Sequence, residues 1–289
     1  MADDGIGYIG LGNMGAAMVV NMLGAGLSVH GFDSAGTGER APESVIAADS
    51  IADIARTCAI VFACVPDGAA SLDVANAIVA AEDRQVRAMI NLSTTGIEAA
   101  ETIASAFDGS GIEFIDAPVS GGRTGAVRGT ITVMWSGSQE LLEQLKPVLE
   151  TFSKSQFFVG PRPGQGQALK LLNNFLSAVA MTATSEAMIF GVANGLDMKT
   201  MLDAVNVSTG QNTATSDKFP NRIVTGTFDS GFRMALMEKD VALYLKEVRS
   251  ARTPDRLSGI VADYFRDGLA RFPEGDFTEI FKTVNDNKV

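Results

Sequence analysis

The side chains best suited to chemistry share one predicted helix. Lys170 is followed three and four residues later by Asn173 and Asn174, so all three side chains project from one helical face. Bulky apolar residues surround the lysine: Leu169, Leu171, Leu172 and Phe175. A lysine in that setting fits a solvated helix face poorly, and burial lowers the pKa of a lysine. Lys170 is therefore a candidate general acid–base.

A glycine-rich segment near the start of the chain has the pattern of a dinucleotide-binding loop. It follows a predicted strand directly and opens a helical stretch that Gly26 closes. We expect the first glycine to make a tight turn, the second to let the backbone approach a pyrophosphate, and the third to allow close packing of helix on strand. The helix N-terminus adds donors and a positive dipole. The predicted cofactor loop is Gly10, Leu11, Gly12, Asn13, Met14 and Gly15.

The end of the next predicted strand carries Asp33, 18 positions after Gly15. A carboxylate at this distance accepts hydrogen bonds from ribose hydroxyls and repels a 2′-phosphate. Ser34 and Ala35 follow, so no arginine stands directly beside it in the sequence. This predicts NAD as the cofactor, with NADP less favoured.

Three further strand ends should face the same crevice, because ligands bind beyond the carboxyl ends of parallel strands. Val65-Pro66 ends one strand, and Ser93-Thr94 ends another, where capping of the following helix is the favoured role. After a third strand, Ser120, Gly121 and Gly122 could bind a substrate carboxylate through backbone N–H groups. A flexible turn is equally compatible with this segment taken alone.

Composition excludes several classes of function. The chain has 289 residues, 46% of them hydrophobic and 20% charged, and its net charge of −11 disfavours nucleic acid as a partner. It has only two cysteines, Cys58 and Cys64, and no cluster with metal-ligand spacing, so we expect no metal. The single histidine, His30, lies in an apolar strand pattern, which nearly excludes histidine acid–base chemistry.

The chain also lacks the patterns of export and membrane insertion. It opens with acidic residues that lead straight into a predicted strand, unlike a signal peptide. The longest apolar stretch, 171–196, contains Asn173, Asn174 and Glu186, so we expect no bilayer-spanning segment and no membrane partner. These features predict a cytoplasmic protein.

Two domains are expected, with the boundary at the proline-rich break Pro161–Gly164. Residues 1–162 alternate strands with helices, which predicts an α/β, Rossmann-type doubly wound sheet that binds NAD. Residues 163–289 show no convincing strand and predict an all-α domain for substrate binding and oligomerisation. Its first helix, 165–194, is long enough to join the two domains. The other predicted elements are strands 6–10, 27–32, 59–65, 88–92, 112–116, 130–135 and 156–159, and helices 198–207, 234–250 and 256–268.

Nearly the whole sequence resembles the β-hydroxyacid dehydrogenase family. The resemblance rests on four motifs in order: IGYIGLGNMGAAM with Asn21, DAPVSGGRTGAVRGT, GQGQALKLLNN, and MEKD at Lys239. It implies a Rossmann-type domain, a C-terminal domain similar to that of 6-phosphogluconate dehydrogenase, and reversible NAD-dependent oxidation of a small 3-hydroxy acid, similar to 3-hydroxyisobutyrate, to the semialdehyde.

The resemblance also implies roles for single residues. Lys170 would be the catalytic acid–base, the Ser120 turn would bind the substrate carboxylate, and Asn174 would hydrogen-bond the substrate. Lys239 would reach both substrate and cofactor, although the apolar periodicity of its helix places it opposite the expected buried face. Beyond the glycine loop, the implied cofactor residues are Asp33, Val65, Pro66, Thr94 and Lys239.

Other functions fit the same sequence. One alternative is an NADPH-dependent reductase of aldehyde acids such as glyoxylate or succinic semialdehyde, and another is a catalytically silent nicotinamide-binding scaffold. Imine reductases resemble this family but usually replace the active-site lysine, which is present here as Lys170. Arg123 is either a substrate contact or, more commonly for arginine, a surface residue. A homodimer or homotetramer is expected from the methionine-rich apolar helices.

Overall fold

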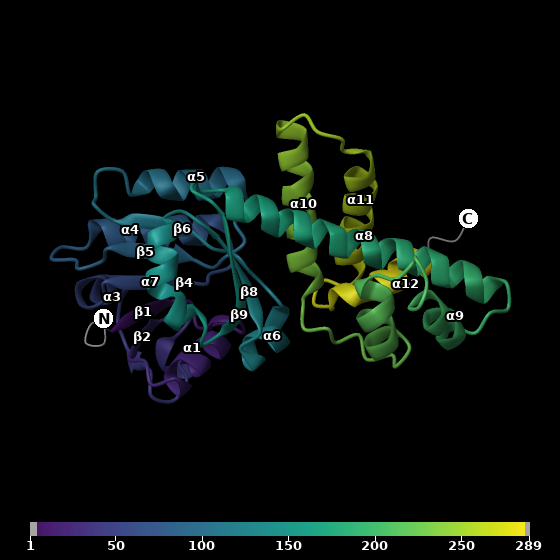
Figure 1. Cartoon of the computed structure of the whole chain (residues 1–289), viewed down its shortest axis with the longest axis horizontal. Coiled ribbons are helices and arrows are strands. Elements are labelled where there is room, and N and C mark those ends of the chain that lie inside the picture. Colours follow the sequence, from purple (N-terminus) through teal and green to yellow (C-terminus); the bar gives the residue numbers. More distant parts are fainter. Residues whose placement is uncertain (1–4, 287–289) are drawn as a thin grey trace. The chain divides into compact units, whose positions relative to one another are not determined.

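The computed structural model describes residues 5–286, which divide into two compact units between Lys170 and Leu171 (Figure 1). The sequence predicts the domain boundary after residue 162. In the structure the two units divide eight residues later, inside a continuous helix. This helix, α8, spans Gln165–Ala193, so its first six residues belong to the first unit and the remainder to the second.

The first unit is built on a nine-stranded sheet in the order β3-β2-β1-β4-β5-β6-β8-β7, with β9 paired to β8. The six strands from β3 to β6 are mutually parallel and follow the order 3-2-1-4-5-6 of a dinucleotide-binding fold. The chain runs from β1 outward to β3 and then returns to β4, so the strand order reverses between β1 and β4. The strands are β1 Ile6–Ile9, β2 Val29–Phe32, β3 Ile46–Ala47, β4 Ile60–Ala63, β5 Ala88–Asn91, β6 Glu113–Asp116, β7 Val119–Ser120, β8 Ile131–Ser136 and β9 Ser153–Gly160.

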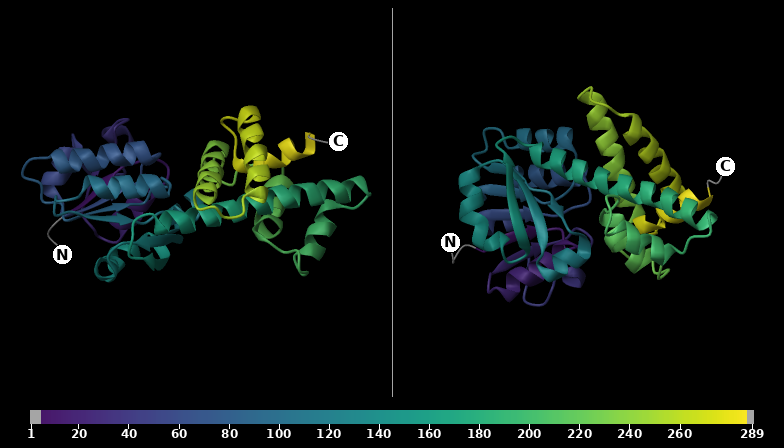
Figure 2. Two further views of the ribbon diagram at one scale, coloured as in Figure 1. Left: turned by 90° about the horizontal axis from the view of Figure 1, so that it is seen from above. Right: turned by 45° about the vertical axis from the view of Figure 1, so that its right-hand side comes forward.

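Helices cover both faces of this sheet, because strand residues alternate between two buried clusters (Figure 1, Figure 2). In β4, Phe62 packs with α1, α6 and α7, whereas Val61 and Ala63 pack with α3, α4 and α5. The doubly wound prediction is thereby confirmed. The helices are α1 Gly15–Gly24, α2 Thr37–Arg40, α3 Ile51–Thr57, α4 Gly68–Ala80, α5 Ile97–Ala106, α6 Gly122–Arg128 and α7 Gln139–Leu149.

All seven predicted strands are present, with bounds shifted by up to three residues. Two strands were missed, β3 and β7, each of two residues. Two residues are too few to show a period, so hydrophobic alternation could not have found them. The second omission matters, because β7 contains Ser120 and pairs it with Thr132 of β8.

The second unit is helical, as predicted, and has no strand among residues 171–286 apart from an isolated bridge between Arg233 and Asp276. Its core gathers side chains from α8 to α12, including the fully buried Phe219 and Phe265. Helix α8 is long and apolar enough to cross a membrane, a test that buried core helices also pass. The other elements are α9 Met198–Val205, the π-helix Ala214–Ile223, α10 Met234–Ser250, α11 Arg256–Arg271, the 3₁₀ helix Phe277–Glu279 and α12 Ile280–Asp286.

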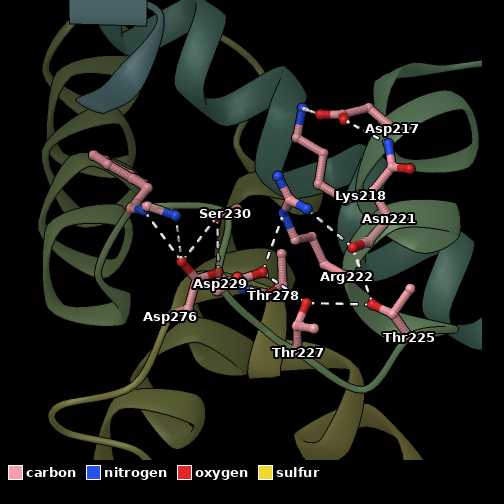
Figure 3. A network of polar contacts seen from close by, with 12 residues as sticks. Asp217, Lys218, Asn221, Arg222, Thr225, Thr227, Asp229, Ser230, Asp276 and Thr278 are labelled. Atoms are coloured by element: carbon pink, nitrogen blue, oxygen red, sulfur yellow. Dashed lines mark hydrogen bonds and ion pairs between the residues drawn. The ribbon is translucent and has the colours of Figure 1, made fainter. Parts of the chain in front are cut away.

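A polar network ties the segment before α10 to the segment before α12 (Figure 3). The Asp276 carboxylate accepts hydrogen bonds from the Ser230 hydroxyl at 2.8 Å and from the Gly231 N–H at 2.9 Å. The same carboxylate caps the 3₁₀ helix by accepting from the Thr278 N–H at 3.0 Å. Arg222, in the π-helix, pairs with Asp229 at 3.3 Å. The network therefore joins the π-helix to the segments before α10 and before the 3₁₀ helix.

Candidate active site

The glycine loop between β1 and α1 is shaped by close backbone contacts. Gly10 has φ +95°, and a Cβ there would lie 2.2 Å from the Cys64 carbonyl oxygen. A Cβ at Gly15 would lie 2.0 Å from the Gly10 carbonyl oxygen. At Gly12, by contrast, a Cβ would meet no heavy atom of the described residues within 4 Å. Packing thus explains Gly10 and Gly15, while the open space at Gly12 is what the approach of a ligand requires.

The start of α1 has the character of an anion site. Met14 stands at the N-cap without a side-chain hydrogen bond, and the first turn contains no acidic residue. The first N–H groups of a helix have no acceptor within it, and the helix dipole adds positive potential there. With the space at Gly12, this end of α1 fits the pyrophosphate of a dinucleotide.

Asp33 follows β2 and reaches back to the glycine loop. Its carboxylate accepts hydrogen bonds from the Leu11 N–H at 2.8 Å and from the Ala35 N–H at 2.9 Å. The Arg40 guanidinium stands 3.4 Å from the same carboxylate and is 47% exposed. The residues that follow Asp33 directly therefore did not reveal its arginine partner, because Arg40 stands seven positions later in the sequence, at the end of the short helix α2.

The ends of β4 and β5 are joined by a hydrogen bond from the Val65 N–H to the Ser93 hydroxyl at 2.9 Å. The expectation that Ser93 or Thr94 caps the next helix was wrong. Helix α5 begins only at Ile97, and its N-cap is Gly96, which makes no side-chain hydrogen bond. Val65 and Thr94 are half-buried and Pro66 is exposed. The Ser93 hydroxyl thus fixes the distance between two strand ends at the carboxyl edge of the sheet.

The Ser120 turn leads from β7 into α6 through two consecutive glycines in the left-handed region. Gly121 has φ +134° and Gly122 has φ +62°, so a side chain at either position would be strained. Ser120 is half-buried, and Arg123 in the next turn is exposed. The role of this turn in binding a carboxylate stays a prediction.

Lys170 lies in the second turn of α8 and is buried, with 7% of its surface exposed. The first turn of α8 is held by Asp116 at the end of β6, whose carboxylate accepts from the Gly164 and Gln167 N–H groups. Burial raises the pKa of Asp116 to about 6, although the hydrogen bonds from Gln167, Ser136 and Gly164 act in the opposite direction.

In the second unit, Asn174 and Lys239 meet at a residue that sequence reasoning missed. The Asn174 side-chain N–H donates to Asp240 Oδ2 at 2.6 Å, and Lys239 Nζ stands 3.5 Å from Asp240 Oδ1. Asn173 donates to Asn174 Oδ1 at 3.1 Å, so both ends of the Asn174 amide are held. Asp240 is only 3% exposed. Its place in the apolar stripe of α10, three residues after Met237, was the available signal.

Comparison with known proteins identifies the family. Residues 5–160 match the model of the NAD binding domain of 6-phosphogluconate dehydrogenase, and residues 164–284 match that of the NAD-binding domain of NADP-dependent 3-hydroxyisobutyrate dehydrogenase. The 2-(hydroxymethyl)glutarate dehydrogenase of Eubacterium barkeri is 31% identical over 92% of this chain and 89% of its own. The chain belongs to the β-hydroxyacid dehydrogenase family.

Two other members of the β-hydroxyacid dehydrogenase family extend the comparison. The NAD-dependent L-serine dehydrogenase of Pseudomonas aeruginosa is 32% identical over 96% of each chain. The structure of Mycobacterium tuberculosis 3-hydroxyisobutyrate dehydrogenase with L-serine has a TM-score of 0.88, with 29% identity over 97% of this chain and 99% of that chain.

Membership of the β-hydroxyacid dehydrogenase family confirms the predicted enzyme class, an oxidoreductase that acts on CH–OH groups with a nicotinamide cofactor. The named relatives act on small hydroxy acids, which supports a small hydroxy acid as the class of substrate. Groups of metal-binding side chains are absent from residues 5–286. The cytoplasmic location and the homo-oligomer stay predictions, and so do the roles of the individual site residues.

Proposed function

We propose that this chain oxidises small 3-hydroxy carboxylic acids to the corresponding semialdehydes, reversibly and with NAD⁺. The observation that carries the proposal is the burial of Lys170, which lies in the same unit as a glycine loop that fits a dinucleotide. The named substrates of three relatives support the substrate class. 3-Hydroxyisobutyrate, L-serine and 2-(hydroxymethyl)glutarate all contain HOCH₂–CH(R)–COO⁻ and differ only in R.

The chemistry divides between the chain and its cofactor. Bound NAD⁺ would supply the hydride acceptor, which no side chain can provide. Lys170, in its neutral form, takes the proton of the substrate hydroxyl as hydride leaves the carbon that bears this hydroxyl. In the reverse direction its ammonium returns that proton. Ser120, Gly121 and Gly122 hold the substrate carboxylate, while Asn174 and Lys239 contact the substrate. Fixing the carboxylate and the hydroxyl separately orients the carbon that loses hydride.

A spectrophotometric assay of NAD⁺ reduction tests the substrate class. We expect turnover with 3-hydroxyisobutyrate, L-serine or 2-(hydroxymethyl)glutarate, since these acids share the spacing between hydroxyl and carboxylate. The matched controls are lactate and 4-hydroxybutyrate, in which that spacing is one carbon shorter or longer. Equal turnover of the controls, or turnover of none of the 3-hydroxy acids, would contradict the proposal.

We propose NAD as the preferred cofactor because Asp33 carries a buried carboxylate at the end of β2. That carboxylate can accept from a ribose hydroxyl and disfavours a 2′-phosphate. Arg40, beside it, favours the alternative, an NADPH-dependent aldehyde-acid reductase, since a guanidinium binds phosphate well. The preference between NAD and NADP therefore depends on whether the Arg40 guanidinium stays in its ion pair with the Asp33 carboxylate.

Asp33→Asn should reverse the cofactor preference. The change removes the negative charge and leaves Arg40 without its counter-ion, so we expect the Kd for NADPH to fall and that for NADH to rise, each about 10-fold. Fluorescence titration with both reduced cofactors measures the two constants. In Asp33→Asn/Arg40→Ala the gain in NADPH affinity should disappear. An unchanged ratio of the two affinities in Asp33→Asn would show that Asp33 does not select the cofactor.

A further inference from the structure

Gln167 is a fully buried amide that uses every hydrogen bond it can make. Its Oε1 accepts from the Thr95 N–H at 2.9 Å and from the Gly96 N–H at 3.2 Å. Its Nε2 donates to the Ser93 carbonyl oxygen at 3.0 Å and to Asp116 Oδ1 at 2.6 Å. If the amide were flipped, its N–H groups would face the Thr95 and Gly96 N–H groups, which are donors as well. The side chain is therefore locked in one position between the ends of β5 and β6.

Asp116 holds the backbone of the same helical turn. Its Oδ2 accepts from the Gly164 N–H at 3.1 Å and from the Gln167 N–H at 3.2 Å, and the Ser136 hydroxyl donates to it at 3.2 Å. The first N–H groups of α8 lack acceptors within the helix, so Asp116 caps α8 from a neighbouring strand. With a pKa of about 6, the carboxyl is mainly ionised at neutral pH and accepts from all of these donors.

Gly166 lets the helix approach the sheet closely enough for these bonds to form. A Cβ at this position would lie 2.6 Å from the Met134 carbonyl oxygen and 3.0 Å from that of Asp116. The Gly166 N–H donates to the Ser136 hydroxyl at 2.9 Å. The first turn of α8 is thus clamped to β6 and β8, and Lys170 follows in the next turn.

We propose that Gln167 is a positioning residue for Lys170: its buried amide, together with Asp116, fixes the first turn of α8 to the ends of β5 and β6 and thereby sets where the lysine amine stands. Apolar side chains could fill this space, but a fully satisfied polar network specifies one arrangement of the parts it joins. Those strand ends lie at the edge of the sheet where ligands bind. The inference rests on the proposed role of Lys170.

The test begins with Gln167→Met, which keeps the size of the side chain and removes its hydrogen bonds. We expect kcat for 3-hydroxyisobutyrate, or for whichever 3-hydroxy acid is turned over, to fall about 10- to 100-fold because the amine is misplaced. The Kd for NADH should stay close to that of the wild type. Gln165→Met is the matched control: it lies in the same turn, but its amide accepts from the Arg162 N–H in the preceding loop. It should retain nearly the full kcat.

A double-mutant cycle separates positioning from mere stabilisation. In a Lys170→Met background, Gln167→Met should lower the residual kcat no further, because the group it positions is already gone. If the two losses multiply instead, Gln167 acts independently of Lys170 and the inference is overturned. An unchanged kcat in Gln167→Met alone overturns it as well.

Two further outcomes are distinguishable. If Lys170→Met keeps full turnover, the proposed role of Lys170 fails and the inference fails with it. If Lys170→Met loses turnover and Gln167→Met does not, the inference alone fails. Should Gln167→Met not fold, Ser136→Ala tests the same network, since it removes one donor to Asp116 and the acceptor of the Gly166 N–H. Ser136→Ala alone should lower kcat less than we expect for Gln167→Met. In the Lys170→Met background it should not lower the residual kcat any further. If the two losses multiply there, the inference is overturned.

Discussion

Replacing Lys170 by alanine should lower kcat by about 10²- to 10⁴-fold, the usual contribution of a general acid–base. The loss is expected because, in the proposed mechanism, Lys170 takes the hydroxyl proton as hydride leaves. The glycine loop and Asp33 are untouched, so the Kd for NADH should stay at the wild-type value. Steady-state kinetics with the best 3-hydroxy acid and a fluorescence titration with NADH measure the two quantities.

The matched control is Lys146→Ala, which removes an exposed lysine from α7 in the same unit. It should leave both kcat and the Kd for NADH unchanged. Wild-type turnover in Lys170→Ala would refute the proposed mechanism, whereas joint loss of turnover and NADH binding would show that Lys170 supports the fold instead of the reaction.

Gly12→Ala should abolish most cofactor binding without destabilising the protein. A methyl group at this position meets no described heavy atom within 4 Å, and Gly12 does not have a positive φ, so the folded chain accommodates it. A dinucleotide on the loop would occupy that space. We expect the Kd for NADH to rise at least about 10- to 100-fold, which corresponds to about 1.4 to 2.8 kcal/mol, with an unchanged melting temperature of the ligand-free protein.

Substitutions of two other glycines serve as controls for Gly12→Ala. Gly24→Ala, at the far end of α1, also places its methyl group in open space and should alter neither binding nor melting temperature. Gly10→Ala drives a Cβ against the Cys64 carbonyl oxygen and should lower the melting temperature. Wild-type NADH affinity in Gly12→Ala would mean that the loop does not hold the cofactor.

The parts of the site that sequence could predict are those encoded locally. The glycine loop depends on three positions within six residues, and the helical face of Lys170 follows from spacings of three and four. The doubly wound sheet follows from the alternation of strands with helices. Each of these signals lies within a short window, where the backbone period determines which side chains share a face.

The parts that were missed depend on contacts between distant segments. The Gln167 amide hydrogen-bonds to Asp116, which is 51 positions away in the sequence, and to Thr95, which is 72 positions away. No helix or strand periodicity relates residues so far apart. Ser93 was expected to cap a helix by local preference, but its hydroxyl accepts from Val65 of the neighbouring strand end. Arg40, at the end of α2, pairs with Asp33 from seven positions away. Side-chain identity alone does not show which distant partner such a group meets.

The π-helix Ala214–Ile223 was missed for a different reason. Its backbone hydrogen bonds join residues five apart, whereas the apolar periodicity used to find helices assumes 3.6 residues per turn. Pro220, inside it, also argues against a regular helix on sequence grounds. The sequence pattern of such a helix is therefore typical of a loop.

Chemical rescue tests most directly whether the Lys170 amine moves the substrate proton. If it does, Lys170→Ala would leave a space beside the reacting hydroxyl that a small amine could enter. We predict that methylamine and ethylamine restore kcat in proportion to their concentration, and that among amines of equal size the rescue varies with the amine pKa, as general base catalysis requires. Lys170→Ala that is fully active without added amine, or that no primary amine restores at any pH, would contradict the account.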